Sequence, residues 1–116
     1  MVKLSLKKIK SVEENFREQI EKICTEKTKY FEDLFKKYEK DLLLEVHFDH
    51  SSSKLYKVKA SINLKSKKVS VSEEGSDIKK VVTKLFSEFK KAVKKQYELE
   101  RKDYEYNAKE NNFLNP

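Results

Sequence analysis

Four segments of the chain alternate apolar and polar residues with a period of two, which is typical of half-buried β-strands. They cover residues 2–7, 42–49, 56–64 and 68–72. Ile9 breaks the parity of the first segment and predicts a bulge or a strand end there. Because each segment has one apolar face, we expect helices to cover only one side of the sheet.

Two other segments repeat apolar residues at helical spacing. The first spans residues 12–38, with Ser11 as the expected N-cap and Glu14 three residues later, and its Cys24 is expected to be buried. The second begins near residue 77 and runs past residue 96. The sequence therefore predicts an α+β fold in the order β-α-β-β-β-α, with a four-stranded sheet and two helices packed on one face.

The length of 116 residues indicates one folded domain. We expect this domain to cover residues 1–97, because the helical period decays beyond Tyr97. Residues 98–116 are expected to form either a helix extension or a flexible C-terminal tail. Tyr104, Tyr106 and Phe113 of this stretch are candidates for stacking on nucleic-acid bases.

The chain is basic, with 27 Lys and Arg against 20 Asp and Glu, a net charge of +7. A polyanion is therefore the first partner to consider. Arg17 and Arg101 are the only arginines, so the attraction would come from lysine point charges, which suit phosphates better than base edges.

The exposed side of the second predicted helix collects most of this charge. Its lysines are Lys79, Lys80, Lys84, Lys90, Lys91, Lys94 and Lys95. Glu88 is the only acid expected on that face, so the face should carry +6 (seven lysines less one glutamate), with its lysines largely unpaired. Uncompensated charge of this kind favours binding to a phosphate backbone.

The stretch before this helix, residues 72–80, combines three acids with the only glycine. Gly75 is expected to adopt a positive φ or a tight turn, and Ser76 or Asp77 to cap the helix. The acids are interpreted as complements of the helix dipole.

Signals for catalysis and for metals are poor. His47 and His50 would point to opposite faces of a strand, and the chain has no glycine-rich phosphate loop and a single cysteine, Cys24. We therefore expect no enzyme activity, catalytic residue, metal, cofactor or small-molecule substrate. A membrane is not an expected partner, because no apolar run reaches a membrane span and the apolar side of the second helix is needed by the sheet. The single cysteine favours a reducing compartment, so the expected location is the cytoplasm, with an organelle as the alternative.

The stretch VSVSEEGSDIKKVVTKLFSEFKKAVKK (residues 69–95) and KYF (residues 29–31) resemble the ribosome hibernation promoting factor family, which includes ribosome-associated inhibitor A. Gly75 and Asp77 match the family's turn, and Lys91 and Lys95 fall on its basic motif. The match covers residues 1–97, as in a short form of the family. The chain departs from the family pattern at Lys79, Ser87, Glu88 and Ala92, and at Ile23 and Glu26 of the first helix.

This resemblance implies a double-stranded-RNA-binding-domain-like fold and no catalysis. It also implies binding to the decoding channel of the small subunit of a 70S-type ribosome, across the A and P sites, where tRNA and mRNA would be excluded and translation silenced under stress. The expected rRNA-binding residues are Lys80, Lys84, Lys90, Lys91, Lys94 and Lys95, with Lys22 and Lys29 of the first helix. Two alternatives stay open: a generic double-stranded-RNA-binding domain and a basic protein-interaction adaptor.

Overall fold

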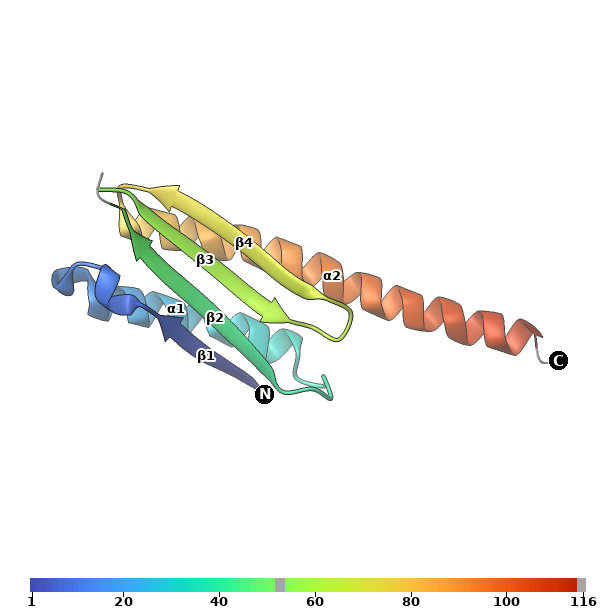
Figure 1. Cartoon of the computed structure of the whole chain (residues 1–116). Helices are drawn as coiled ribbons and strands as arrows, with labels where there is room; N and C mark the ends of the chain where they lie inside the picture. The colour runs from blue at the N-terminus through green and yellow to red at the C-terminus, as the bar shows by residue number, and fades with distance from the viewer. Residues whose placement is uncertain (52–53, 115–116) are drawn as a thin grey trace.

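The computed structural model describes residues 1–51 and 54–114, with the side chains of the last helix described as far as residue 102 (Figure 1). The elements are β1 (Val2–Lys7), the 3-10 turn η1 (Ile9–Ser11), α1 (Glu14–Leu34), β2 (Leu42–His50), β3 (Tyr56–Asn63), β4 (Lys68–Gly75) and α2 (Ile78–Leu114). This order confirms the predicted α+β fold.

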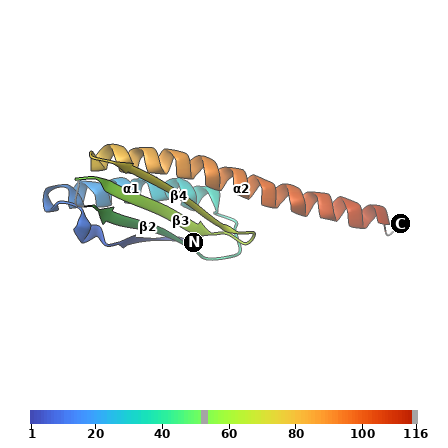
Figure 2. The same cartoon turned by 45° about the horizontal axis from the view of Figure 1, so that its top comes forward.

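The four strands form one mixed sheet in the order β1-β2-β3-β4. β1 and β2 are parallel, and α1 provides the crossover that a parallel pair requires. β2, β3 and β4 follow one another as antiparallel neighbours. Both helices cover the same face of the sheet and run in the same direction, as Figures 1 and 2 show, so the other face of the sheet is open to solvent.

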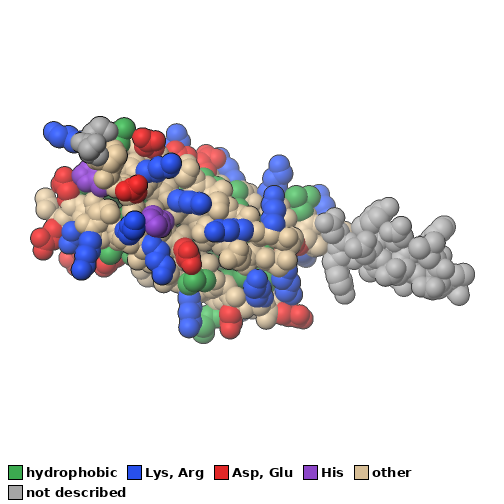
Figure 3. Space-filling model, in the orientation of Figure 1, with side chains coloured by type: hydrophobic (Ala, Val, Ile, Leu, Met, Phe, Trp, Pro, Cys, Tyr) green, Lys and Arg blue, Asp and Glu red, His purple; other side chains and the backbone are tan. Residues whose placement is uncertain are grey.

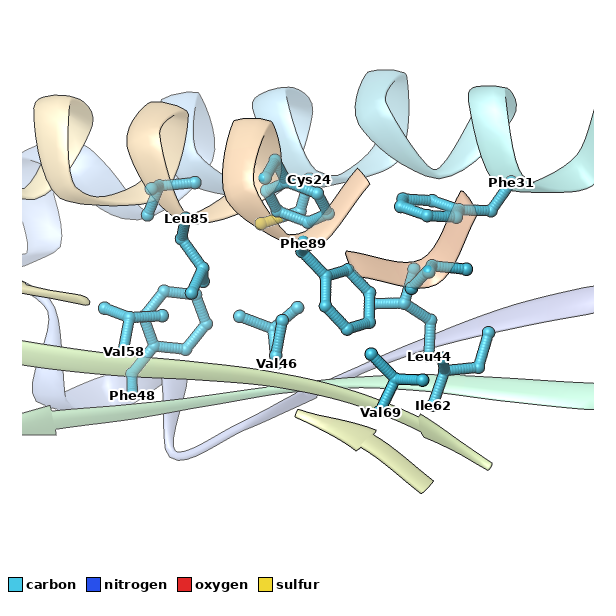
Figure 4. Close-up of a cluster of buried hydrophobic side chains, with 14 of the residues drawn as sticks. Cys24, Phe31, Leu44, Val46, Phe48, Val58, Ile62, Val69, Leu85 and Phe89 are labelled. Carbon is cyan, nitrogen blue, oxygen red and sulfur yellow. The ribbon is translucent and has the colours of Figure 1, made fainter. Parts of the chain in front are cut away.

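The core lies between this sheet and the two helices (Figure 4). Alternate residues of the central strands, such as Val46 and Phe48, are fully buried and point toward the helices, from which Phe31 of α1 and Phe89 of α2 point into the same core. Cys24 is buried among them, as expected. The alternation of apolar residues thus predicted correctly which face of each central strand points inward.

The ends of α1 differ from the prediction. Ser11 is not its N-cap: it lies in η1, and the N-cap position belongs to Glu13, whose side chain makes no capping hydrogen bond. The strand does end before Ile9, and Lys8 turns the chain with a φ of 57°. α1 stops at Leu34 rather than at residue 38, because the apolar residues that follow pack against α2 without being helical.

Beyond α1, a hydrogen-bonded cluster fixes α2 to two loops. The Tyr38 hydroxyl donates to Glu100 Oε1 (2.6 Å) and accepts from the backbone N–H of Lys65 (2.9 Å). The Ser66 hydroxyl donates to Glu100 Oε2 (2.7 Å) and accepts from Gln96 Nε2 (2.9 Å). Burial and the bond to Glu100 raise the pKa of Tyr38 to about 12. The cluster joins the α1–β2 loop and the β3–β4 turn to one stretch of α2.

From this cluster α2 continues past Tyr97 to Leu114. The side chains of Tyr104, Tyr106 and Phe113 lie outside the described residues.

Candidate nucleic-acid interface

The candidate interface is the outward face of α2. Its inward face is formed by buried residues such as Val82, Leu85 and Phe89, which cover the sheet. The helical repeat of 3.6 residues therefore turns all seven predicted lysines outward, and all seven are exposed.

Successive positions around the helix divide these lysines into two rows, and Thr83 and Ser87 are exposed beside the lysines nearer α1. The β4-side row lies toward the neighbouring strand, and the α1-side row lies toward the other helix. The β4-side row consists of Lys80, Lys84, Lys91 and Lys95, and the α1-side row consists of Lys79, Lys90 and Lys94. A shallow groove along the β4-side row includes Lys91 and Lys95 together with Val71 of β4.

Two acids partner the β4-side row. Lys84 Nζ lies 3.8 Å from Glu73 Oε2, and Lys91 Nζ lies 3.8 Å from Glu88 Oε1. The expectation that Glu88 is the only acid on this face was therefore wrong. Glu73 was missed because it precedes the helix in sequence, whereas β4 carries it alongside α2. Both lysine side chains stay at least 70% exposed, so such pairs contribute only about 0–1 kcal/mol and can be exchanged for a phosphate.

Aromatic rings of α1 partner the α1-side row. Lys90 Nζ lies 4.3 Å from the centroid of the Tyr30 ring, and Lys79 Nζ lies 5.8 Å from that of Phe16. These are cation–π contacts within the usual limit of about 6 Å. They place aromatic side chains beside the lysines, which the sequence pattern of α2 alone did not reveal.

Lys80, Lys94 and Lys95 have neither an ion pair nor a ring contact within the part of the chain that the structure describes. Counting the acids that do pair, the face carries seven lysines and two glutamates, a balance of +5. The uncompensated charge is thus slightly smaller than the sequence predicted. It belongs to these three lysines together with Lys79 and Lys90, because a ring contact does not neutralise an ammonium group.

The surface of α1 is different in character. Lys22 and Lys29 are exposed, but α1 contains six acidic residues against four basic ones. The α1 lysine that shares a groove with Lys90 of α2 is Lys27, which was not among the predicted site residues.

The open face of the sheet is also less basic than α2. This face, which Figure 3 shows from the front, carries three acids, Glu45, Asp49 and Glu74, and five lysines, Lys3, Lys7, Lys57, Lys59 and Lys68. Lys57 is opposite Asp49 on β2 and Glu74 on β4. The other four lysines are not directly opposite an acid. The difference from α2 lies in the balance of charge, which is five lysines against three acids, or +2, on this face.

The start of α2 is set by two residues of the acidic stretch. Asp77 Oδ1 accepts hydrogen bonds from the backbone N–H groups of Lys79 (3.1 Å) and Lys80 (3.4 Å), which confirms it as the cap. Gly75 does not have a positive φ, so that part of the expectation was wrong, although only two residues separate β4 from α2. A Cβ at Gly75 would instead lie 2.8 Å from Val81 Cγ2, and the glycine permits the end of β4 to approach the first turn of α2.

The residues considered for catalysis are dispersed. His47 is exposed on β2, while His50 stacks on Tyr56 with ring centroids 4.2 Å apart. Burial raises the pKa of the Cys24 thiol to about 12, which makes it a poor nucleophile. Within residues 1–51 and 54–102, no group of three His, Cys, Asp or Glu residues could hold a metal ion. No helix in the described part of the chain is long and apolar enough to cross a membrane.

No protein-family model matches this chain, and no curated protein matches it. Solved structures do resemble it. One is a ribosomal subunit interface protein from Coxiella burnetii, which is 14% identical and has a TM-score of 0.45 over 83% of this chain and 97% of the other. A likeness this distant assigns neither a family nor a function.

Proposed function

We propose that the protein binds the ribosome through the two lysine rows of α2 and silences translation. The observation that carries the proposal is the α2 face itself, with seven exposed lysines and only two acid partners. Among possible polyanionic partners, we choose the ribosome because residues 69–95 resemble the ribosome hibernation promoting factor family.

The geometry of the rows suits a phosphate array. Residues 79–95 span about 24 Å of helix at 1.5 Å per residue, so several phosphates of one RNA backbone fall within reach. Each phosphate that a lysine neutralises releases counterions, which provides a binding force that falls as salt rises. Lys80, Lys94 and Lys95 can do so without losing an internal partner.

On this proposal the target is the rRNA of the small subunit, in the decoding channel across the A and P sites. A domain seated there would occupy the space of tRNA and mRNA and hold an idle 70S-type ribosome inactive. The protein would act by occupancy rather than by catalysis, in the compartment that contains the ribosomes.

Sedimentation with purified ribosomes and small subunits tests the proposal. The test variant is Lys94→Glu/Lys95→Glu, which reverses the charge of two exposed lysines that lack ion pairs within the described residues. The matched control is Lys59→Glu/Lys68→Glu on the open face of the sheet, where neither residue is opposite an acid. Both variants change the net charge by −4, from +7 to +3.

We expect the α2 variant to lose about tenfold or more in affinity and the sheet variant to bind nearly as wild type. Equal losses in the two variants would show that only net charge matters, and wild-type protein that never cosediments would overturn the proposal. A translation assay with the same proteins should show inhibition in the same order. If free duplex RNA competes as well as ribosomes do, the protein is a generic RNA-binding domain instead.

A further inference from the structure

A groove of about 470 Å³ lies between α1 and α2, on the α1 side of the lysine rows. Its size falls within the range of about 300–1,000 Å³ that is usual for clefts binding small molecules. The buried rings of Phe31 and Phe86 form part of its lining. Its polar lining is Glu26, Lys27 and Tyr30 from α1, with Thr83, Ser87 and Lys90 from α2.

The Tyr30 ring is held firmly but is only half-buried. It packs edge-to-face on Phe31, with centroids 5.3 Å apart and planes at 84°, and Phe31 in turn packs on Phe89. The Lys90 ammonium group lies 4.3 Å from the Tyr30 centroid. This face of Tyr30 is therefore covered by a flexible, exposed side chain rather than by the core.

Two hydroxyl groups in the groove are available to a ligand. Thr83 and Ser87, one turn apart on α2, make no hydrogen bond within the described part of the chain. The contrast with α1 is clear, because Thr25 and Thr28 donate to backbone carbonyls four residues earlier at 2.8 Å and 2.7 Å. A hydroxyl in the middle of a helix either bonds back to such a carbonyl, as in α1, or points out to solvent.

The charged side chains of the groove suit different parts of a nucleotide, the phosphate and the base. Lys27 and Lys90 attract phosphate, while the Glu26 carboxylate repels it and can accept hydrogen bonds from the N–H groups of a base. A ring to stack on, free hydroxyls and flanking lysines are together the features of single-strand recognition.

We propose that this groove binds one unpaired RNA nucleotide, with its base stacked on Tyr30 and its phosphates on Lys27 and Lys90. The inference rests on the proposed function and adds to it a preference for unpaired RNA. Lys90 exchanges its contact with Tyr30 for a phosphate. An exposed cation–π contact is worth about two- to fivefold in an equilibrium constant. A base stacked on an aromatic ring is worth about five- to hundredfold, so the exchange is favourable.

The test compares two single strands of equal length and charge, one of RNA and one whose sugars carry no bases. Binding of each to the full chain is followed by fluorescence anisotropy. The wild type should prefer the RNA strand by about five- to hundredfold. Tyr30→Phe, which keeps the ring, should retain this preference. Tyr30→Leu should bind both strands equally, and its affinity for the strand without bases should not fall below that of the wild type, because Lys90 then has no ring contact to give up.

A second readout does not depend on the folding of Tyr30→Leu. The chain contains no tryptophan, so Tyr30→Trp introduces a single reporter. Its emission should be quenched by the RNA strand and not by the strand without bases.

The proposal for the groove is wrong if the wild type binds both strands equally, or if the emission of a saturated Tyr30→Trp complex is not quenched. Neither result contradicts the proposal that the protein binds the ribosome. Failure to bind either strand or the ribosome overturns both.

Discussion

The junction between β4 and α2 allows a quantitative test of why the chain has a glycine at position 75. Replacing Gly75 by Ala adds a Cβ that would lie 2.8 Å from Val81 Cγ2, whereas carbon atoms in contact normally lie about 3.5–4.0 Å apart. Val81 is 6% exposed and sits in the first turn of α2. A β-branched residue in a helix has one strongly preferred rotamer, so Val81 cannot easily turn away.

The expected free-energy change combines two effects. Overpacking of this kind costs about 1–3 kcal/mol. Because the φ of Gly75 is not positive, alanine also restricts the unfolded chain, which stabilises the fold by about 0.4–1 kcal/mol. We therefore expect Gly75→Ala to lower the free energy of unfolding by about 0–2.6 kcal/mol.

Urea unfolding followed by far-UV circular dichroism measures this change, and a double-mutant cycle identifies its cause. In a Val81→Ala background the clashing methyl group is gone, so Gly75→Ala should become neutral or stabilising. Gly75→Asn should cost at least as much as Gly75→Ala, whereas a positive φ would favour asparagine. A stabilising Gly75→Ala in the wild type, or an unchanged cost in Val81→Ala, would refute the close-approach explanation.

Three further outcomes are expected. Cys24, which is fully buried with a pKa of about 12, should react with a thiol reagent only after unfolding, and rapid labelling of native protein at neutral pH would contradict its burial. Tyr38→Phe removes the donor to Glu100 and should cost about 1–3 kcal/mol in urea unfolding. Folding raises the pKa of Tyr38 from 10.0 to about 12, so the contribution of Tyr38 to the free energy of unfolding is complete below pH 10 and is lost as the pH rises to 12. The loss of stability at alkaline pH should therefore be smaller in Tyr38→Phe than in the wild type. Identical curves of stability against pH for the two proteins would contradict this. Lys94→Ala/Lys95→Ala should reduce the slope of log affinity against log salt for ribosome binding by about 0.9 for each phosphate that is no longer neutralised, and an unchanged slope would show that neither lysine meets a phosphate.

The pattern of the sequence predicted the sheet and the helices well because both depend on local geometry. Side chains alternate across a strand and recur every 3.6 residues along a helix, so Val46 and Phe48 point inward for reasons contained within β2 itself. The same rule predicted the outward lysines of α2. It was less reliable at helix ends, where Ser11 had the signature of a cap but lies in a 3-10 turn.

Contacts between elements were decided only by the tertiary structure. Tyr38 and Glu100 are 62 residues apart in sequence and meet because α2 continues beyond the β3–β4 turn. Glu73 reaches Lys84, and Tyr30 reaches Lys90, because β4 and α1 flank α2 on opposite sides. Such pairs depend on strand register and helix placement, which no local period encodes. The sequence by itself therefore determined that α2 presents a basic face, whereas the packing of α1 and β4 determined which lysines are free and where a groove opens beside them.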